Sequence, residues 1–173
     1  MRSRQNQGGA VLSVVTAIAL LTAPTAVLTL GSPAPAFDLK DQFDRVWRLA
    51  DLRGKIVVLM AADQHSGQGM RPWGDNLSAA FGTQIQLLGL LDLHTYPSFL
   101  RIFVAARIRS ETDKPMLLDF SGAVGTAYEV SSRYPVIVVI DRQGMVRGIY
   151  KTTFTRDAFA GAREAIEAAL NTE

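Results

Sequence analysis

The hydrophobic and polar positions after residue 30 form short apolar runs that are separated by polar turns. Two of these runs, residues 56–60 and 136–140, contain no polar residue. A strand buried on both faces has this pattern, so both runs predict central strands of a sheet. Residues 85–91 predict a further buried strand, and residues 115–119 predict a shorter one.

Two β-hairpins are predicted from alternation and turn chemistry. Apolar and polar residues alternate at residues 37–40 and again at 46–49, with a polar turn between the two segments. Near the other end of the chain, Asp-Arg-Gln-Gly at residues 141–144 is a turn sequence. It connects the strand at 136–140 to a partner at residues 145–150, which therefore runs antiparallel to it.

The first long helix is predicted from apolar residues at a helical spacing. Trp73, Leu77 and Phe81 are four residues apart and so share one face. Pro72 is suited to a first helical turn, and Gly82 is suited to the residue after the last one. The prediction is therefore a helix that begins at Pro72 and is buried along one side.

Two more long helices and one short helix are predicted further along the chain. One follows Pro97, a brief one covers residues 123–128, and the last has Thr155 as its N-cap. The apolar positions are Leu100, Phe103, Val104 and Ile108 in the helix after the proline, and Phe159, Ala162, Ile166 and Leu170 in the last helix.

The order of the elements predicts an α/β domain at residues 31–173. A hairpin comes first, followed by strand, helix, strand and helix, then a short strand, a second hairpin and a closing helix. The packing expected for this order is a mixed sheet with helices on both faces.

The N-terminus, residues 1–30, is predicted to be an export or anchor segment. Arg2 and Arg4 precede an apolar run at residues 10–30, which as a helix would span the roughly 30 Å of a bilayer's hydrocarbon core. The positive-inside rule then leaves the rest of the chain outside the cytoplasm, on the periplasmic or cell-surface side. The length of the run fits a retained membrane anchor, whereas Pro24, which favours an early end to the helical part, fits a cleaved signal peptide. Both alternatives remain open.

Charge and cysteine content exclude several functions. The formal net charge of +2 comes from Arg2 and Arg4, since residues 31–173 hold 16 basic and 16 acidic side chains. A domain with balanced charge does not predict nucleic-acid binding. The chain has no cysteine, so disulfides, thiolate nucleophiles and cysteine-bound zinc are all excluded.

Five short motifs occur in order along the predicted domain. They are Gly-x-x-Ala-Pro-x-Phe-x-Leu-x-Asp at 31–41, Leu-x-x-Leu-x-Gly-Lys at 49–55, Leu-Asp-x-x-Gly at 118–122, Ala-Tyr-x-Val at 127–130, and Tyr-Pro followed by Val-Ile-Val-Val-Ile-Asp-Arg-Gln-Gly at 134–144. On these motifs the chain resembles the thioredoxin-like redoxin proteins, which include the alkyl hydroperoxide reductase/thiol-specific antioxidant group and the membrane-anchored thiol–disulfide oxidoreductases. The resemblance implies a thioredoxin-like fold with an N-terminal β-hairpin.

The resemblance also implies where the redox cysteines would stand. Counted from Gly54-Lys55, the first cysteine of the oxidoreductase type would fall at Ser66 and the second at Gly69. A hydroxyl cannot replace a thiolate in disulfide exchange or peroxide reduction, so no catalytic residue is predicted at this degenerate slot. Pro135 matches the position at which the family holds a structural cis-proline facing the active-site loop.

Two histidines offer the one remaining chemistry. His65 and His94 each follow a predicted strand, and ligands gather at that edge of an open α/β sheet. With Asp63, Met70 or Asp92 they could form a copper or zinc site, although two widely separated histidines are a weak signal. No cofactor is predicted. His65 beside Ser66 does not predict a serine nucleophile, because adjacent loop residues rarely face each other.

Two functions remain open on this evidence. The first is a redox-inactive module that binds a protein or peptide in the cell envelope, with His65, Ser66, Gly67, Arg71 and Pro135 as the candidate binding residues. The second is a metal- or cofactor-dependent envelope redox protein that uses the edge carrying the two histidines. The partner is unknown in the first case, and the N-terminal segment contacts the membrane if it is not cleaved.

Overall fold

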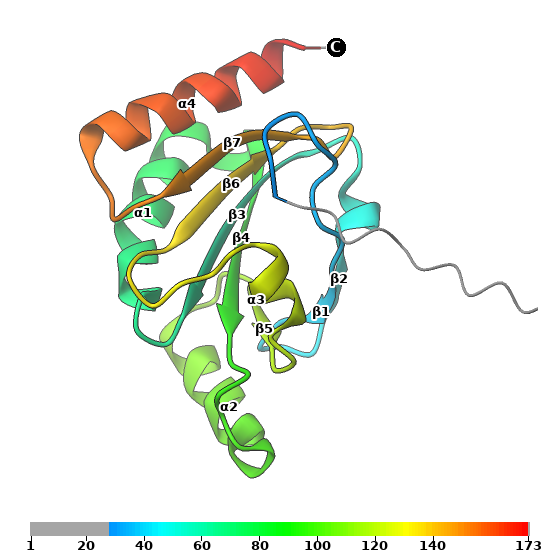
Figure 1. Cartoon of the computed structure of the whole chain (residues 1–173), viewed down its shortest axis with the longest axis vertical. Helices are drawn as coiled ribbons and strands as arrows, with labels where there is room; N and C mark the ends of the chain where they lie inside the picture. The colour runs from blue at the N-terminus through cyan, green and yellow to red at the C-terminus, as the bar shows by residue number, and fades with distance from the viewer. Residues whose placement is uncertain (1–27, 173) are drawn as a thin grey trace, which may run out of the picture.

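The computed structural model describes residues 28–172. A five-stranded sheet at its centre has the strand order β5-β4-β3-β6-β7 (Figure 1). Its strands are β3 (Ile56–Asp63), β4 (Ile85–Asp92), β5 (Met116–Asp119), β6 (Val136–Ile140) and β7 (Val146–Lys151). A separate hairpin consists of β1 (Asp38–Lys40) and β2 (Val46–Arg48), and the helices are α1 (Met70–Phe81), α2 (Arg101–Glu111), α3 (Ala123–Ala127) and α4 (Arg156–Asn171).

The segment predicted to be a signal peptide or anchor, residues 1–30, lies outside the described residues except for its last three. Among residues 28–172, no helix is both long enough and apolar enough to cross a membrane.

Strand β3 is central because both of its faces are apolar. Seven of its eight residues are buried. It pairs in parallel with β4 on one side and antiparallel with β6 on the other. The sheet is therefore mixed, as the sequence predicted, and the carboxyl ends of β3, β4 and β5 meet at one edge.

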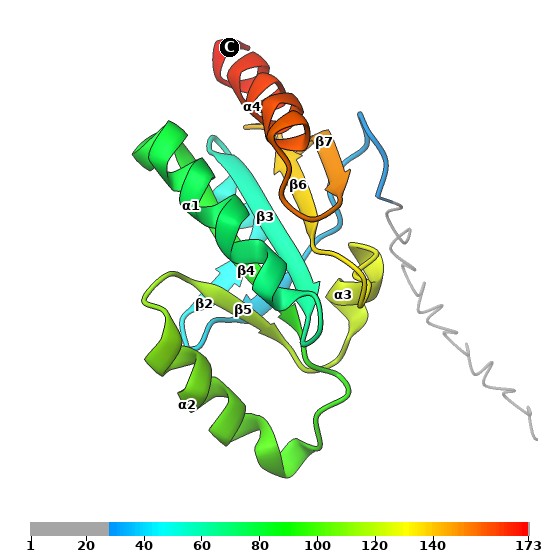
Figure 2. The same cartoon turned by 90° about the vertical axis from the view of Figure 1, so that its left-hand side faces the viewer.

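The two faces of the sheet are covered by different elements. Helices α1 and α4 pack on one face, where Trp73 and Leu77 of α1 and Ile166 of α4 are fully buried (Figure 2). The hairpin β1–β2, the segment before it and α3 lie against the other face. There Tyr128, directly after α3, is fully buried and donates a hydrogen bond of 2.7 Å to the carbonyl of Pro35. This bond joins two segments that are far apart in the sequence.

Each of the two hairpins is built around its own buried aspartate. The carboxylate of Asp41 accepts hydrogen bonds from the amides of Phe43 and Arg45 and from the indole nitrogen of Trp47. Asp141 takes the same place in the second hairpin, where it accepts the amides two and four residues later. In each case the aspartate closes its own turn, because it supplies acceptors that the turn's amides would otherwise lack.

Several predicted boundaries are wrong by a few residues. Helix α1 begins at Met70 instead of Pro72, and it is preceded by a 3₁₀ turn at Gly67–Gly69. Strand β3 continues beyond residue 60 to Asp63, because the alanines after residue 60 stay buried. The N-cap of α4 is confirmed, since the Thr155 hydroxyl accepts from the amide of Ala158 at 3.1 Å.

One apolar residue of the second predicted helix is exposed. Val104 and Ile108 pack against the end of the sheet, together with Leu93 and Leu118. Phe103, in contrast, is 71% exposed. Helix α2 therefore carries apolar side chains on more than its buried side.

We expect Asp41→Asn to destabilise the fold in a pH-dependent way. Burial alone would raise the pKa of Asp41, but hydrogen bonds from Trp47, Phe43 and Arg45 outweigh it and hold this pKa below the ordinary value of 3.8. The carboxylate therefore stabilises the fold above pH 3.8, and that contribution is lost as the pH falls through the lowered pKa. At neutral pH the substitution should lower the free energy of unfolding by about 1–3 kcal/mol.

Urea unfolding at several pH values measures this effect. The difference between the variant and the parent should shrink as the pH falls below 3.8. Asp51→Asn is the matched control, because the side chain of Asp51 is 67% exposed and its ion pair with Arg48 spans 3.7 Å. A control loss as large as that of Asp41→Asn would contradict the role given to the buried carboxylate.

Candidate functional site

Three aspartates stand in a row at the carboxyl edge of the sheet. Asp63 of β3 is in register with Asp92 of β4, which is in register with Asp119 of β5. Each carboxylate accepts hydrogen bonds from the loop that follows its own strand. The loops at this edge are thus held by side chains at the strand ends.

Asp119 shows how completely such a carboxylate can be used. It is fully buried and accepts from four backbone amides and one hydroxyl. Burial alone would raise its pKa, but hydrogen bonds from Ser121, Gly125 and Gly122 hold the pKa below the ordinary value. This carboxylate is a structural group that organises the turn before α3.

The loop after β3 is folded around Asp63 and Ser66. One carboxylate oxygen of Asp63 accepts from the amide of His65 at 2.9 Å, from the amide of Ser66 at 2.8 Å and from the Ser66 hydroxyl at 2.9 Å. In return, the amide of Asp63 donates to the Ser66 hydroxyl at 3.1 Å. Burial alone would raise the pKa of Asp63, but hydrogen bonds from Ser66, His65 and Ser132 lower it.

Ser66 also connects this loop to the one before β6. Its hydroxyl lies 2.9 Å from the carbonyl oxygen of Ser131, sixty-five residues further along the chain. The residue is only 5% exposed, and its oxygen has partners on both sides. His65, the adjacent histidine, instead contacts Gln64 through its Nε2. The ring of His65 therefore makes no hydrogen bond with the Ser66 hydroxyl and is not placed as its base.

Gly69 lies directly against Pro135. The four residues from Ser66 to Gly69 form a turn that is closed by a 3.0 Å hydrogen bond from the amide of Gly69 to the carbonyl of Ser66. A Cβ atom added to Gly69 would lie 3.0 Å from Cδ of Pro135. The two predicted cysteine positions are thus the two ends of one tight turn, packed on the predicted proline.

The prediction of a cis peptide bond at Pro135 is not supported. Among residues 28–172 no peptide bond is cis, so the bond before Pro135 is trans. The trans form is favoured in an X–Pro bond unless the surrounding structure requires the other. Pro135 contacts Gly69 even though the bond before Pro135 is trans.

The two histidines do not form a metal site with the neighbouring carboxylates. Nδ1 of His94 lies 2.7 Å from the carboxylate of Asp92, so this ring is held by its own loop. Met70, another candidate ligand, is 5% exposed and belongs to the core under α1. Within the described part of the chain, no three histidine, aspartate or glutamate side chains lie close enough to bind a metal ion.

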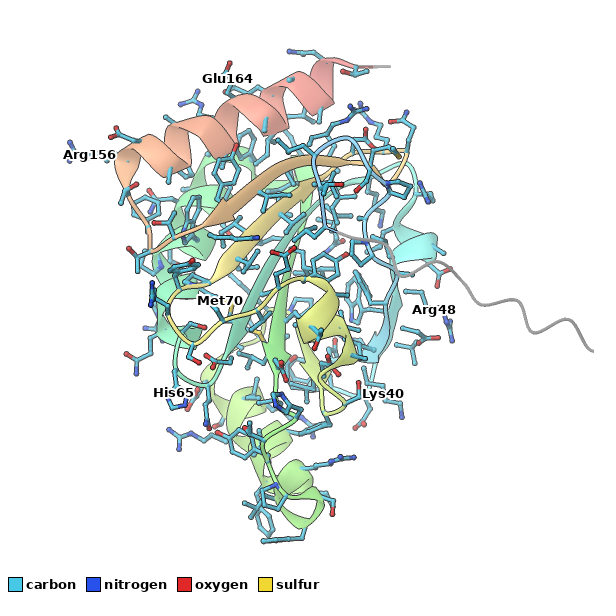
Figure 3. The ribbon with its side chains drawn as sticks, viewed as in Figure 1. Lys40, Arg48, His65, Met70, Arg156 and Glu164 are labelled. Carbon is cyan, nitrogen blue, oxygen red and sulfur yellow. The ribbon has the colours of Figure 1, made fainter. Side chains whose placement is uncertain are left out.

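The predicted binding residues divide into buried and exposed ones. Ser66 and Pro135 are buried, so they support the two loops from beneath. His65 and Arg71 are exposed, and Gly67 is half-buried (Figure 3 labels His65). Trp73, predicted to be core, is fully buried and packs edge-on against Phe154, with the ring centroids 5.5 Å apart.

Solved structures that superpose on the chain identify its fold. A protein from Chlorobium tepidum proposed to be the thiol:disulfide interchange protein DsbE matches 83% of this chain and 99% of its own, with 22% identity and a TM-score of 0.66. A proposed protein disulfide isomerase from Bacteroides thetaiotaomicron matches 85% of this chain and 93% of its own, with 20% identity and a TM-score of 0.64. The chain has a thioredoxin-like fold. No protein-family model and no curated protein matches it in sequence.

A further thioredoxin-like neighbour is an exposed lipoprotein. The pneumococcal lipoprotein thioredoxin Etrx1 of Streptococcus pneumoniae matches 77% of this chain and 98% of its own, with 20% identity and a TM-score of 0.59. The neighbours from Chlorobium tepidum and Bacteroides thetaiotaomicron are named for thiol–disulfide chemistry, which requires sulfur. This chain keeps their fold and has no cysteine.

The sequence missed the partner of Ser66. Nothing in the local sequence connects Ser66 to Ser131, because the contact joins two loops that are neighbours only in the folded sheet. A sequence signal did exist for the row of aspartates. Asp63, Asp92 and Asp119 each follow an apolar run directly, which is where a strand end needs acceptors.

Ser66→Ala should destabilise the fold because it leaves the two loops unconnected. The substitution removes the single hydroxyl proton that lies between the acceptors of Ser131 and Asp63, and it removes the acceptor of the Asp63 amide, so we expect a loss of about 1–3 kcal/mol in the free energy of unfolding. Ser98→Ala, at an exposed serine before α2, is the control and should change stability by less than about 0.5 kcal/mol. Equal losses in the two variants would contradict the role of the Ser66 hydroxyl.

The double variant Ser66→Cys/Gly69→Cys should form an intramolecular disulfide. The ends of a closed four-residue turn have Cα atoms less than about 7 Å apart, which overlaps the roughly 4.4–6.8 Å that a disulfide spans. The side chain at position 69 must push Pro135 back by a few tenths of an ångström. Thiol titration before and after reduction measures the outcome, with Ser66→Cys alone as the control. Two thiols that stay free under oxidising conditions would show that the turn is not a redox slot.

Proposed function

We propose that this protein is a redox-inactive thioredoxin-like module that binds a protein or peptide partner in the cell envelope. The turn from Ser66 to Gly69 carries the proposal. It retains a compact shape against Pro135, while its only side-chain hydroxyl is used to join two loops. A site of this kind presents a shaped surface and has no reacting group.

The proposed binding surface consists of two adjacent loops at the carboxyl edge of β3. One is the loop after β3, where Gln64, His65 and Gln68 are exposed, and the other precedes β6, where Ser132 and Arg133 are exposed. Polar side chains and loop backbone are suited to hydrogen bonding with an extended peptide.

Both loops are held in place from beneath, which favours binding. Ser66 and Asp63 connect them by hydrogen bonds, and Gly69 packs on Pro135. A surface that is already ordered loses less conformational entropy when a partner binds. The glycines at 67 and 69 have no side chains, so a peptide backbone could approach the turn closely.

The N-terminal sequence supports a location outside the cytoplasm. Arg2 and Arg4 ahead of the apolar run at residues 10–30 are typical of an exported or membrane-anchored chain. The thioredoxin-like neighbour from Streptococcus pneumoniae is itself described as an exposed lipoprotein. The proposed partner is accordingly another envelope protein.

Site-specific photocrosslinking of the full chain in its own envelope tests this function. A photoreactive residue at Gln68 or at Arg133 should crosslink the same partner, because the two positions belong to the two loops of one surface. The control position is Thr83, which is exposed between α1 and the start of β4, away from the carboxyl edge. Adducts that are equal at all three positions, or absent from Gln68 and Arg133, would count against the proposed surface.

A further inference from the structure

Helix α2 has apolar side chains on two opposite sides. Its inner side carries Val104, Ala105 and Ile108, which pack against the end of the sheet and the residues around it. Its outer side carries Ile102 and Phe103, which are 80% and 71% exposed. The fold needs only the inner side, because a helix on a protein surface normally has a polar outer face.

The outer apolar residues form one continuous surface at the start of the helix. Phe99, in the turn before α2, is 73% exposed. Phe99, Ile102 and Phe103 have the spacing i, i+3 and i+4, so they lie together on one side. Helix α2 projects beyond the sheet in both views, which places this surface at an extremity of the molecule (Figures 1 and 2). We call these three residues the α2 tip.

Helix α2 and the turn before it contain more arginines than acids. Residues 98–111 contain the arginines 101, 107 and 109 and one acid, Glu111, which is a net charge of +2. Arg107, one turn beyond Phe103, has a side chain that is 81% exposed and pairs with Glu111 at 2.9 Å. Arg109 instead turns to the hairpin, where it donates to the carbonyl of Gln42 and lies 3.5 Å from Asp44. Arg101 directly precedes Ile102 and lies over the ring of Phe120 at 5.0 Å, on the inner side of the helix. It makes no ion pair with an acidic side chain among residues 28–172, so it is the source of the net positive charge at this end of α2.

We propose that the α2 tip inserts into an anionic phospholipid bilayer. Apolar side chains that project from a helix end next to an arginine without an acidic partner are suited to the boundary between headgroups and acyl chains. Anionic headgroups complement the net positive charge around the tip. The domain would then contact the membrane at the end from which α2 projects.

A bilayer fits the α2 tip better than a protein does. Three side chains of about 150–250 Å² at most expose a few hundred square ångströms, and a specific protein interface buries about 800 Å² on each side. A second copy of this chain would also bring two surfaces of net positive charge together, which is unfavourable. Shallow insertion of three side chains has neither problem.

This inference goes beyond the proposed function and does not depend on it. The α2 tip uses residues 99–103, while the proposed partner surface uses the loops after β3 and before β6. Lipid contact at the tip would orient the domain on the membrane, whatever partner the loops bind.

Fluorescence of a single new indole in the full chain tests the proposal. Phe103→Trp reports on the α2 tip, and Val46→Trp is the matched control, because Val46 is a partly exposed apolar residue of the hairpin. The parent chain supplies the background of Trp47 and Trp73. Each protein is mixed with vesicles of phosphatidylcholine, with or without phosphatidylglycerol, that contain a brominated phospholipid.

With phosphatidylglycerol present, the indole of Phe103→Trp should shift to shorter wavelength and be quenched by the bromines, whereas that of Val46→Trp should not. Quenching should fall when salt is added, because the attraction to anionic lipid is screened. Introducing both Phe99→Ser and Ile102→Ser into the Phe103→Trp chain should abolish quenching, whether the N-terminal segment is cleaved or retained. In the chain whose N-terminal segment is cleaved, the two substitutions should also weaken binding to anionic vesicles at least about tenfold.

Three outcomes would overturn the proposal. The first is an unquenched indole at position 103. The second is equal quenching in Phe103→Trp and Val46→Trp, which would mean that contact is not specific to the tip. The third is a blue shift without vesicles that grows with protein concentration, which would assign the α2 tip to a second copy of the chain. None of these outcomes bears on the crosslinking test of the partner surface.

Discussion

Strand β3 is buried on both faces over seven of its eight residues, and the other elements of the structure are arranged by this constraint. An apolar strand without a solvent side must be covered twice, so α1 and α4 pack on one face and the hairpin with α3 on the other. Its backbone groups must also be paired on both edges, which β4 and β6 provide. The polar residues that follow the strand are therefore delivered to one edge of the sheet.

At that edge, carboxylates and one hydroxyl do the work of organising loops. Asp63, Asp92 and Asp119 are the last residues of three neighbouring strands and lie in register with one another. Their carboxylates accept hydrogen bonds from the loops that follow these strands. Ser66 then joins the first of these loops to the loop before β6. In the position where the resemblance to redoxins implies a thiol, the chain thus has a hydroxyl with a structural use. A thioredoxin-like scaffold can keep the shape of this turn without its chemistry, because the turn is closed by hydrogen bonds and by contact with Pro135.

Helix α2 is held differently from the rest of the molecule. A satellite cluster with Leu93 and Leu118 anchors its inner side, and the buried Gln42 of the hairpin fastens the segment that follows it, since the side chain of Gln42 bonds to the backbone of Thr112, Lys114 and Met116. These contacts fix the helix firmly and still leave its first turn outside the core. Exposed apolar residues on a well-anchored element suggest an interaction, because folding alone does not require them.

The sequence by itself determined the strands, the long helices, the mixed α/β class and the absence of thiol chemistry. Apolar runs such as 56–60 and 136–140, the spacing of Trp73 and Leu77, and the cap at Thr155 are local signals, and local physics was sufficient to interpret them. Only the tertiary structure decided that Ser66 bonds to Ser131, that the bond before Pro135 is trans, and that Phe103 faces outward. It also decided that neither histidine belongs to a group of three or more metal-ligating side chains among the described residues. The reason is that each of these depends on which loops and faces meet across the sheet. The sequence shows which positions of a helix are apolar, whereas the neighbouring elements determine which of those side chains are covered.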